Sequence, residues 1–357
     1  EQTFIILQLL GNVAVAICIL GLSQCALQKS AGTATSMLCF AYGLWGLTKL
    51  GQSEIFSAYA THTQFAIAAC LLAFMLLLRQ SAVASGLTLG IAANVNLFIA
   101  FWSLLAASAW LQMPRNGLSS KHKWQFFIAF AVFAAPVLWW VAQVRLSTPK
   151  SDVELEFFKE LLAGHLYAFE YPQALLHTLL LGASAGIATV RFPKGTDNVH
   201  KVGLLTVVAT VVLLAGALTP YLYHHDLIIA LQPLRFASVV VILAAACSVA
   251  LFVSNISGIG SSIFPVIALA GFMMKLPLVS ILGFSFAIVP SNAAMRLARI
   301  SFPLLAIAAT LLHAPPVAPN AKHAIAALLA TLGQIFWPQR IHGVGGVGIA
   351  LGCIDVG

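Results

Sequence analysis

The stretch Val83–Leu111, VASGLTLGIAANVNLFIAFWSLLAASAWL, contains no charged residue and is longer than one membrane crossing needs. A helix spans the hydrocarbon core of a bilayer with about 20 mostly apolar residues. Asn94 and Asn96 stand in the middle of this stretch and interrupt the apolar run with two amides. The stretch is therefore either one tilted span or a broken pair of helices. Both readings predict a segment that is embedded in lipid.

The rest of the chain has the same character. Of the 357 residues, 61% are hydrophobic and 8% are charged. Soluble domains carry roughly 25% charged residues, so this chain has too few to cover a surface that faces water. In lipid the backbone must satisfy its own hydrogen bonds, which leaves helices and closed barrels. Barrel strands alternate polar and apolar residues, whereas these runs are apolar throughout, so we expect helices.

Apolar runs on both sides of Val83–Leu111 predict an all-α fold: a polytopic transmembrane helical bundle with about ten to twelve spans. The other expected spans are Phe4–Leu27, Thr33–Leu50, Tyr59–Leu78, Trp124–Val144, Ala174–Val190, Val202–Tyr221, Phe236–Ile256, a Gly/Ser/Pro-broken region Ile259–Pro290, Ile300–Leu312 and Ala324–Trp337.

The predicted spans divide the chain into four parts. N-terminal transmembrane helices occupy residues 1–144, an acidic interfacial loop 145–173, C-terminal transmembrane helices 174–338, and a Gly-rich tail 339–357. In the loop, Ser151 and Glu154 fit a helix-capping box, and apolar residues then recur at helical spacing. We expect a short amphipathic helix, Ser151–Leu162, lying in the membrane interface.

The charged residues collect in a few loops. Pro114–Lys123 and Arg191–Lys201 are basic, whereas Arg145–Pro172 holds half of the ten acidic residues. If Val83–Leu111 crosses the membrane once, the two basic loops share a side, and the positive-inside rule assigns them to the cytoplasm. Topology thus explains the net charge of +8, with membrane lipids as partners and no nucleic acid.

The acidic loop contains the first group of candidate functional residues. His165, Tyr167, Glu170 and Tyr171 follow the predicted amphipathic helix within a few residues. A histidine, two tyrosines and a glutamate at a membrane surface suit the binding of a polar headgroup or a sugar. The alternative interpretation is an aromatic belt with solvated charges.

A second group lies between two predicted spans. Asp226 follows the end of one span, and Gln232 and Arg235 stand at the head of the next. An arginine that opens an apolar span suits a phosphate or a carboxylate, and the alternative is a snorkelling anchor. The adjacent His224 and His225 project in different directions on a helix, and no metal site is predicted.

Three of these passages together resemble bacterial polytopic membrane proteins related to the C-type glycosyltransferases. A span followed by the turn Arg79-Gln80 and then Ala84–Gly90 is similar to a passage of that family. The loop ending His165…Tyr171-Pro172 resembles its periplasmic loop rich in His, Tyr and Pro, and Leu231–Arg235 its Gln-Pro-x-Arg element. The resemblance covers roughly residues 1–256.

The resemblance implies transfer of a sugar from a polyprenyl-phosphate carrier at the outer face of the bacterial inner (plasma) membrane. The family uses an acidic residue in its first external loop, near the first span. The matching part of this chain departs from that pattern, because Glu54 is the only acid there apart from Glu1.

Three hypotheses follow. The first is an enzyme of glycosyltransferase type that acts on a lipid-linked substrate, with Glu170 as the acid and His165 beside it; no cofactor is predicted, although a transferase of this type can use a divalent metal. The second is a non-catalytic accessory or scaffold subunit of a larger membrane complex, packed through the small-residue pairs Gly86/Gly90 and Gly182/Gly186. The third is a transporter or flippase.

Overall fold

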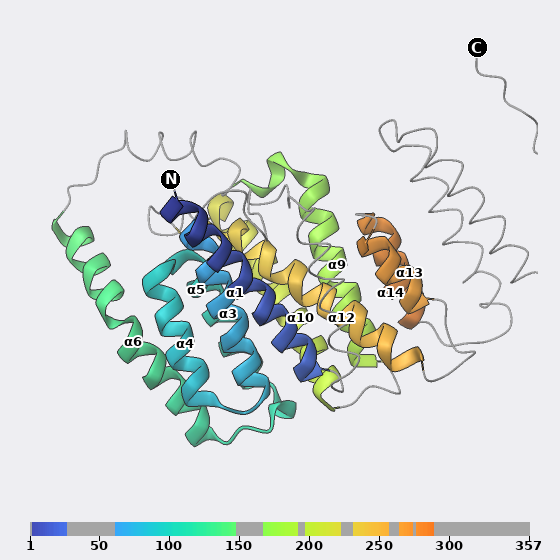
Figure 1. The fold of residues 1–357 in the computed structure, drawn as a ribbon, viewed down its shortest axis with the longest axis horizontal. Helices are drawn as coiled ribbons and strands as arrows, with labels where there is room; N and C mark the ends of the chain where they lie inside the picture. The colour runs from blue at the N-terminus through green and yellow to red at the C-terminus, as the bar shows by residue number, and fades with distance from the viewer. Residues whose placement is uncertain are drawn as a thin grey trace, which may run out of the picture. The chain divides into compact units, whose positions relative to one another are not determined.

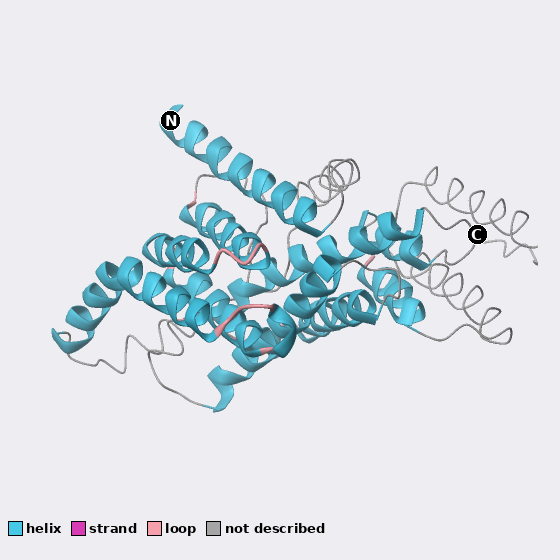
Figure 2. Ribbon diagram, turned by 90° about the horizontal axis from the view of Figure 1, so that it is seen from below, coloured by secondary structure: helices cyan, strands magenta, loops and turns pink. Residues whose placement is uncertain are grey.

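The computed structural model describes residues 2–26, 61–147, 167–191, 197–222, 231–256, 264–273 and 276–288. Throughout these ranges the regular structure is helical, without any strand (Figure 2). The α-helices are α1 (Gln2–Ala26), α3 (His62–Leu78), α4 (Ala82–Val95), α5 (Leu97–Gln112), α6 (Ser120–Ser147), α9 (Pro172–Arg191), α10 (Asp197–Leu222), α12 (Ala237–Ile256), α13 (Phe264–Met273) and α14 (Pro277–Ile288). Short 3₁₀ helices are η2 (Pro114–Asn116), η3 (Ala168–Glu170) and η4 (Pro233–Phe236). The all-α prediction is confirmed for this part of the chain.

Among the described residues, five helical segments are long and apolar enough to cross a membrane, and they indicate an integral membrane protein. They are Gln2–Leu22, Ser120–Val144, Pro172–Arg191, Asp197–Leu222 and Pro233–Phe252. The helices α3, α4 and α5 are apolar but shorter. Several predicted elements lie outside the described residues: Thr33–Leu50, Ser151–Leu162, Ile300–Leu312, Ala324–Trp337 and the tail 339–357.

The stretch Val83–Leu111 is a broken pair of helices, and the break is at Asn96. This residue has an extended backbone (φ −152°, ψ 100°) between α4 and α5. Its Oδ1 accepts hydrogen bonds from the backbone N–H groups of Phe98 (3.1 Å) and Ile99 (3.4 Å), which caps α5. Its Nδ2 donates to Thr63 Oγ1 at 3.4 Å, near the start of α3.

The chain reverses direction at this break. Asn96 lies beside the start of α3, while a Cβ built on Gly117, just beyond α5, would lie 2.9 Å from Gln80 Nε2, just beyond α3. The helices α3 and α5 are therefore parallel. Because α4 follows α3 through the tight turn Arg79–Ser81, α4 runs opposite to both. The pair α4–α5 is thus a helical hairpin with a single residue at its tip.

The hairpin defines two ends of the bundle. We call one the Arg79 end: it carries the turn Arg79–Ser81, the α5–α6 connection and the α9–α10 connection. The opposite Arg235 end carries Asn96 and η4. Gly216, late in α10, fits against Trp102 of α5 and Pro233 of η4, which brings the end of α10 to the Arg235 end. The predicted basic loops therefore belong to one end of the bundle, even though α4 and α5 do not form a single crossing.

Both predicted glycine pairs make close helix contacts inside the chain. A Cβ on Gly86 would clash with the carbonyl oxygen of Phe126 in α6, and one on Gly90 would lie 2.9 Å from the carbonyl oxygen of Phe130. A Cβ on Gly186 would lie 2.8 Å from the carbonyl oxygen of Gly203 in α10. The predicted close packing is confirmed, and it joins α4 to α6 and α9 to α10.

The most apolar environment surrounds α12. Of the candidate span Pro233–Phe252, 94% is buried inside the protein, because α12 packs against α1, α9, α10 and α13 (Figure 1). The buried thiol of Cys247 lies 3.2 Å from Thr206 Oγ1 of α10. By contrast, 11% of Ser120–Val144 in α6 is buried. The core therefore forms around α12, and α6 is a peripheral helix.

The predicted broken region Ile259–Pro290 contains two short helices, α13 and α14. They form an antiparallel hairpin in which Ser280 Oγ donates to the carbonyl oxygen of Ala268 at 2.9 Å. The same contact closes the α3–α4 hairpin, where Ser85 Oγ donates to the carbonyl oxygen of Ala73 at 2.7 Å. At 10 and 12 residues, α13 and α14 are each too short to cross the membrane alone.

Candidate functional site at the Arg235 end

The predicted residues Gln232 and Arg235 stand at the point where the chain enters α12. Gln232 has a left-handed backbone conformation (φ 41°, ψ 64°), and its carbonyl oxygen accepts a hydrogen bond from the N–H of Arg235 at 3.1 Å. A residue other than glycine in this conformation costs of order 1–3 kcal/mol, and such residues cluster at functional sites. The cost is met by packing, because Pro233, Leu234 and Phe236 are all buried.

Two elements hold this turn in place. Trp102 Nε1 of α5 donates to the carbonyl oxygen of Leu231 at 2.9 Å, which fixes the residue before Gln232. Gly216 of α10 leaves room for Pro233, since a Cβ there would lie 2.9 Å from the Pro233 Cβ. The turn is therefore fixed by α5 on one side and α10 on the other.

The site contains buried polar atoms without a hydrogen-bond partner within the described ranges. Gln232 is 6% exposed, and its Oε1 is one such atom. The fully buried Oγ of Ser238, the second residue of α12, is another. A buried acceptor that is left unpaired costs about 1–3 kcal/mol, so a ligand that donates a hydrogen bond here gains that free energy.

The structure adds His62 to the predicted set. His62, the first residue of α3, lies within electrostatic reach of Arg235. The guanidinium and the imidazole therefore come from helices far apart in the sequence and act on each other at this end.

The aromatic residues of the acidic loop form a second group at the same end. Tyr167 packs edge-on against Tyr221 of α10, with ring centroids 5.7 Å apart, and Phe169 also contacts Tyr221. The backbone N–H of Phe169 donates to the Tyr221 hydroxyl at 2.9 Å. Tyr171 ends η3, and its carbonyl oxygen accepts from Leu175 in α9. These contacts anchor the end of the loop to α9 and α10.

For the remaining predicted site residues, the structure describes only the backbone position of Glu170. The backbone of Glu170 lies in η3, between the Tyr167 contact and the start of α9. His165 and Asp226 lie outside the described residues. Within the described ranges, no three His, Cys, Asp or Glu side chains gather as metal ligands would.

Sequence reasoning missed His62 and Trp102. Both lie within predicted apolar spans, and neither belongs to a recognisable motif. A histidine in the first turn of a span, directly after the capping Thr61, was the available signal. For Trp102 there was no signal, because its partner Leu231 is distant in the sequence.

Comparison with known proteins adds no relative to this picture: no family model, no characterised protein and no solved structure matches the chain.

Proposed function

We propose that the chain is an integral membrane protein that binds a polyprenyl-phosphate sugar at the Arg235 end and acts as a glycosyltransferase of the C type. The observation that supports this proposal is the strained turn Gln232–Arg235, with its buried, unpartnered Gln232 Oε1. A sugar hydroxyl can donate to that oxygen, while a phosphate can accept from the planar guanidinium of Arg235. The position at a helix-bundle end suits a ligand whose tail remains in lipid.

The aromatic group supports the same assignment. Tyr167, Phe169 and Tyr221 present ring faces and hydroxyls beside η3, which carries Glu170. Such rings stack against the apolar faces of sugars and sit stably at a membrane interface. In this proposal Glu170 acts as general base or as ligand of a divalent metal, and Arg235 binds the phosphate.

The glycine pairs give no specific support to the competing accessory-subunit hypothesis. It relied on the glycine faces for contact with other subunits, and both faces are occupied within the chain. A partner subunit would have to use another surface, such as the exposed face of α6.

Replacing Arg235 tests the phosphate site. We expect Arg235→Lys to weaken binding of a polyprenyl phosphate about tenfold, because a point charge replaces a fork that makes two hydrogen bonds. Arg235→Ala should weaken it further. Binding is measured with the purified protein in nanodiscs, and Lys201→Gln, which removes a basic charge already paired with Asp197 at the Arg79 end, is the control. Unchanged binding in Arg235→Ala would leave Arg235 with a snorkelling role and contradict the proposed site.

Replacing Glu170 tests catalysis separately from binding. Purified protein incubated with a pool of polyprenyl-linked sugars should transfer sugar, and Glu170→Gln should reduce the rate at least about a hundredfold, as expected for a lost general base. Binding of the polyprenyl phosphate should persist in this variant. Full activity would remove Glu170 from the mechanism, and an intact protein without transfer activity would favour the accessory-subunit hypothesis.

A further inference from the structure

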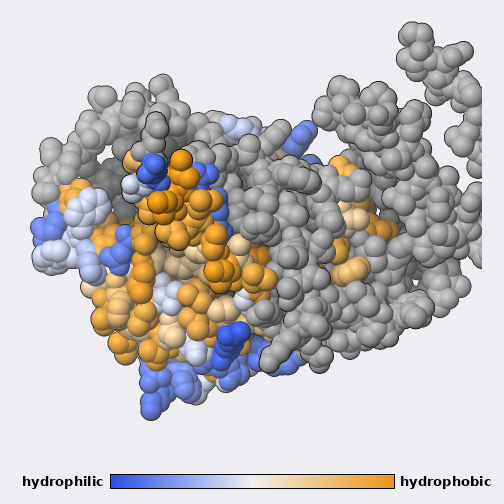
Figure 3. Space-filling model, viewed as in Figure 1, coloured by the Kyte–Doolittle hydropathy of each residue, from blue (hydrophilic) through white to orange (hydrophobic). Residues whose placement is uncertain are grey.

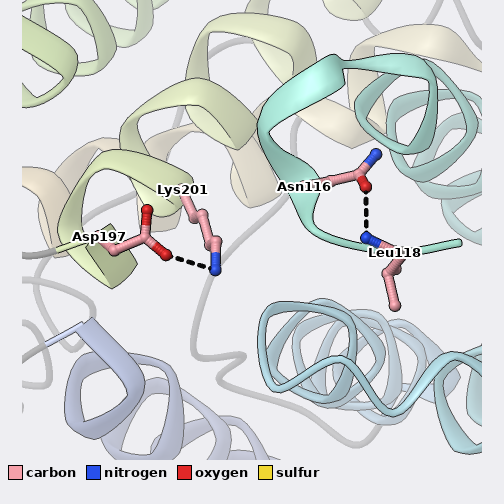
Figure 4. Close-up of polar contacts among 4 residues, drawn as sticks. All are labelled: Asn116, Leu118, Asp197 and Lys201. Carbon is pink, nitrogen blue, oxygen red and sulfur yellow. Dashed lines mark hydrogen bonds and ion pairs between the residues drawn. The ribbon is translucent and has the colours of Figure 1, made fainter.

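Basic side chains gather at the Arg79 end, away from the proposed site. Arg79, Lys121 and Arg191 are exposed there, Lys123 is half-buried, and they come from three separate connections. Asp197 is the sole acid described at this end, and it pairs with Lys201 at 2.7 Å (Figure 4). The lower edge of the surface in Figure 3 is accordingly hydrophilic, beneath a broad apolar band.

Hydrogen bonds hold the turn after α3 and the connection between α5 and α6 in shape. Asn116 Oδ1 accepts from the N–H of Leu118 at 2.8 Å (Figure 4). Its Nδ2 donates to the carbonyl oxygen of Leu111 at 2.6 Å. Arg79 Nε donates to Cys25 Sγ of α1 at 3.0 Å. These contacts fix Arg79 and the connection that leads to Lys121 and Lys123 at one end of the bundle.

The helix α6 locates the membrane relative to this end. Trp124, Trp139 and Trp140 are 68%, 69% and 63% exposed. Trp124 and Trp139 lie about 22 Å apart along the helix at 1.5 Å per residue. Tryptophan prefers the membrane–water interface, so Trp124, in the first turns of this lipid-facing helix, indicates the interface at the Arg79 end. Lys121 and Lys123 come just before Trp124, at headgroup level.

We propose that Arg79, Lys121, Lys123 and Arg191 form an interaction surface for the anionic phospholipid headgroups of the cytoplasmic leaflet. Charge complementarity favours this partner: four basic side chains lie at the Arg79 end, where Trp124 indicates the membrane interface. The opposite end contains Arg145 and Arg235 together with Glu170 among its described residues. The positive-inside rule then assigns the Arg79 end to the cytoplasm and the Arg235 end to the external face.

Brominated lipids test the surface in the intact chain, because they quench exposed tryptophans on contact. One protein carries Trp139→Phe and Trp140→Phe and so retains Trp124; its counterpart carries Trp124→Phe. We expect brominated phosphatidylglycerol to quench the first protein with about a threefold preference over brominated phosphatidylcholine, and the second with none. The other tryptophans are common to both proteins, so any difference in quenching between the two proteins comes from the tryptophans of α6.

Charge removal provides the control. Adding Lys121→Gln and Lys123→Gln to the first protein should abolish its preference for the anionic lipid, while Lys201→Gln, whose charge is already paired with Asp197, should preserve it. Equal lipid preferences at the two ends of α6, or a preference that survives neutralisation, would overturn the proposal.

The orientation is tested by cysteine labelling in intact cells. Gln173, in the first turn of α9, is exposed at the Arg235 end, and Lys121 is exposed at the Arg79 end. A membrane-impermeant maleimide should label Gln173→Cys directly and Lys121→Cys only after permeabilisation. The native Cys18, Cys70 and Cys247 are buried, and the unmodified protein gives the background. The reverse pattern, or equal labelling, would overturn the assignment of the Arg79 end to the cytoplasm.

Discussion

Gly86→Leu is expected to separate α4 from α6 and to lower the free energy of unfolding by about 3 kcal/mol. The Cβ of any side chain at this position clashes with the carbonyl oxygen of Phe126, and it would lie 3.0 Å from the carbonyl carbon. These are backbone atoms, so no rotation of a side chain relieves the overlap. The two helices must move apart, and the contact at Gly90 is lost with them.

Unfolding of the purified protein in a denaturing detergent series measures this loss. Val83→Leu is the matched control, because Val83 lies on the same helix and is 50% exposed. A second consequence concerns Asn94, whose Nδ2 donates to the carbonyl oxygen of Phe133 at 2.6 Å across the same contact. Once the helices separate, Asn94→Ala should cost little further stability. Wild-type stability in Gly86→Leu would show that α4 and α6 do not pack as described.

Asn96→Leu is expected to cost about 2–3 kcal/mol and to disrupt the α4–α5 hairpin. The substitution removes the cap on the N–H groups of Phe98 and Ile99, worth about 1–2 kcal/mol, and the contact with Thr63, worth about 1 kcal/mol. It also removes one of the two amides that interrupt Val83–Leu111. The longer apolar run then favours a continuous helix over a reversal.

A disulfide crosslink reports whether the hairpin persists. The buried Cys70 of α3 and the buried Ser103 of α5 lie within reach of each other, so Ser103→Cys should form a disulfide with Cys70 under mild oxidation. Asn96→Leu should abolish this crosslink, whereas Asn96→Ser, which keeps a capping oxygen, should retain it. A crosslink of equal yield in Asn96→Leu would mean that packing alone holds α4 and α5 in place.

Local sequence determined the helices but not their directions. The two amides at 94 and 96 left a tilted span and a broken pair equally open. The choice depends on Thr63, which accepts from Asn96 and belongs to a different helix. The glycine pairs similarly predicted close packing without naming the partner helix. A single sequence contains no record of such distant contacts, so these parts of the fold required the structure.

The candidate site also has a part that the sequence predicts and a part that only the structure shows. Gln232 and Arg235 are three residues apart, and their grouping was predictable from the chain alone. Their unusual backbone was not, because it depends on Trp102 and Gly216 from two other helices. His62 could not be predicted as part of the site for the same reason, because its electrostatic interaction with Arg235 depends on the packing of α3 near the start of α12.

The burial of α12 has a consequence for how the protein is made. Ribosomes deliver α1, α9 and α10 to the membrane before α12, yet all three pack against it. When synthesis has reached Leu222, α12 does not yet exist. The surfaces of α1, α9 and α10 that contact α12 in the complete protein are then still exposed to lipid. Order of synthesis and order of assembly differ here, and the bundle closes only when the segment ending at Ile256 has left the translocon. Surveillance proteases that sample unpaired helices have their best access during that interval.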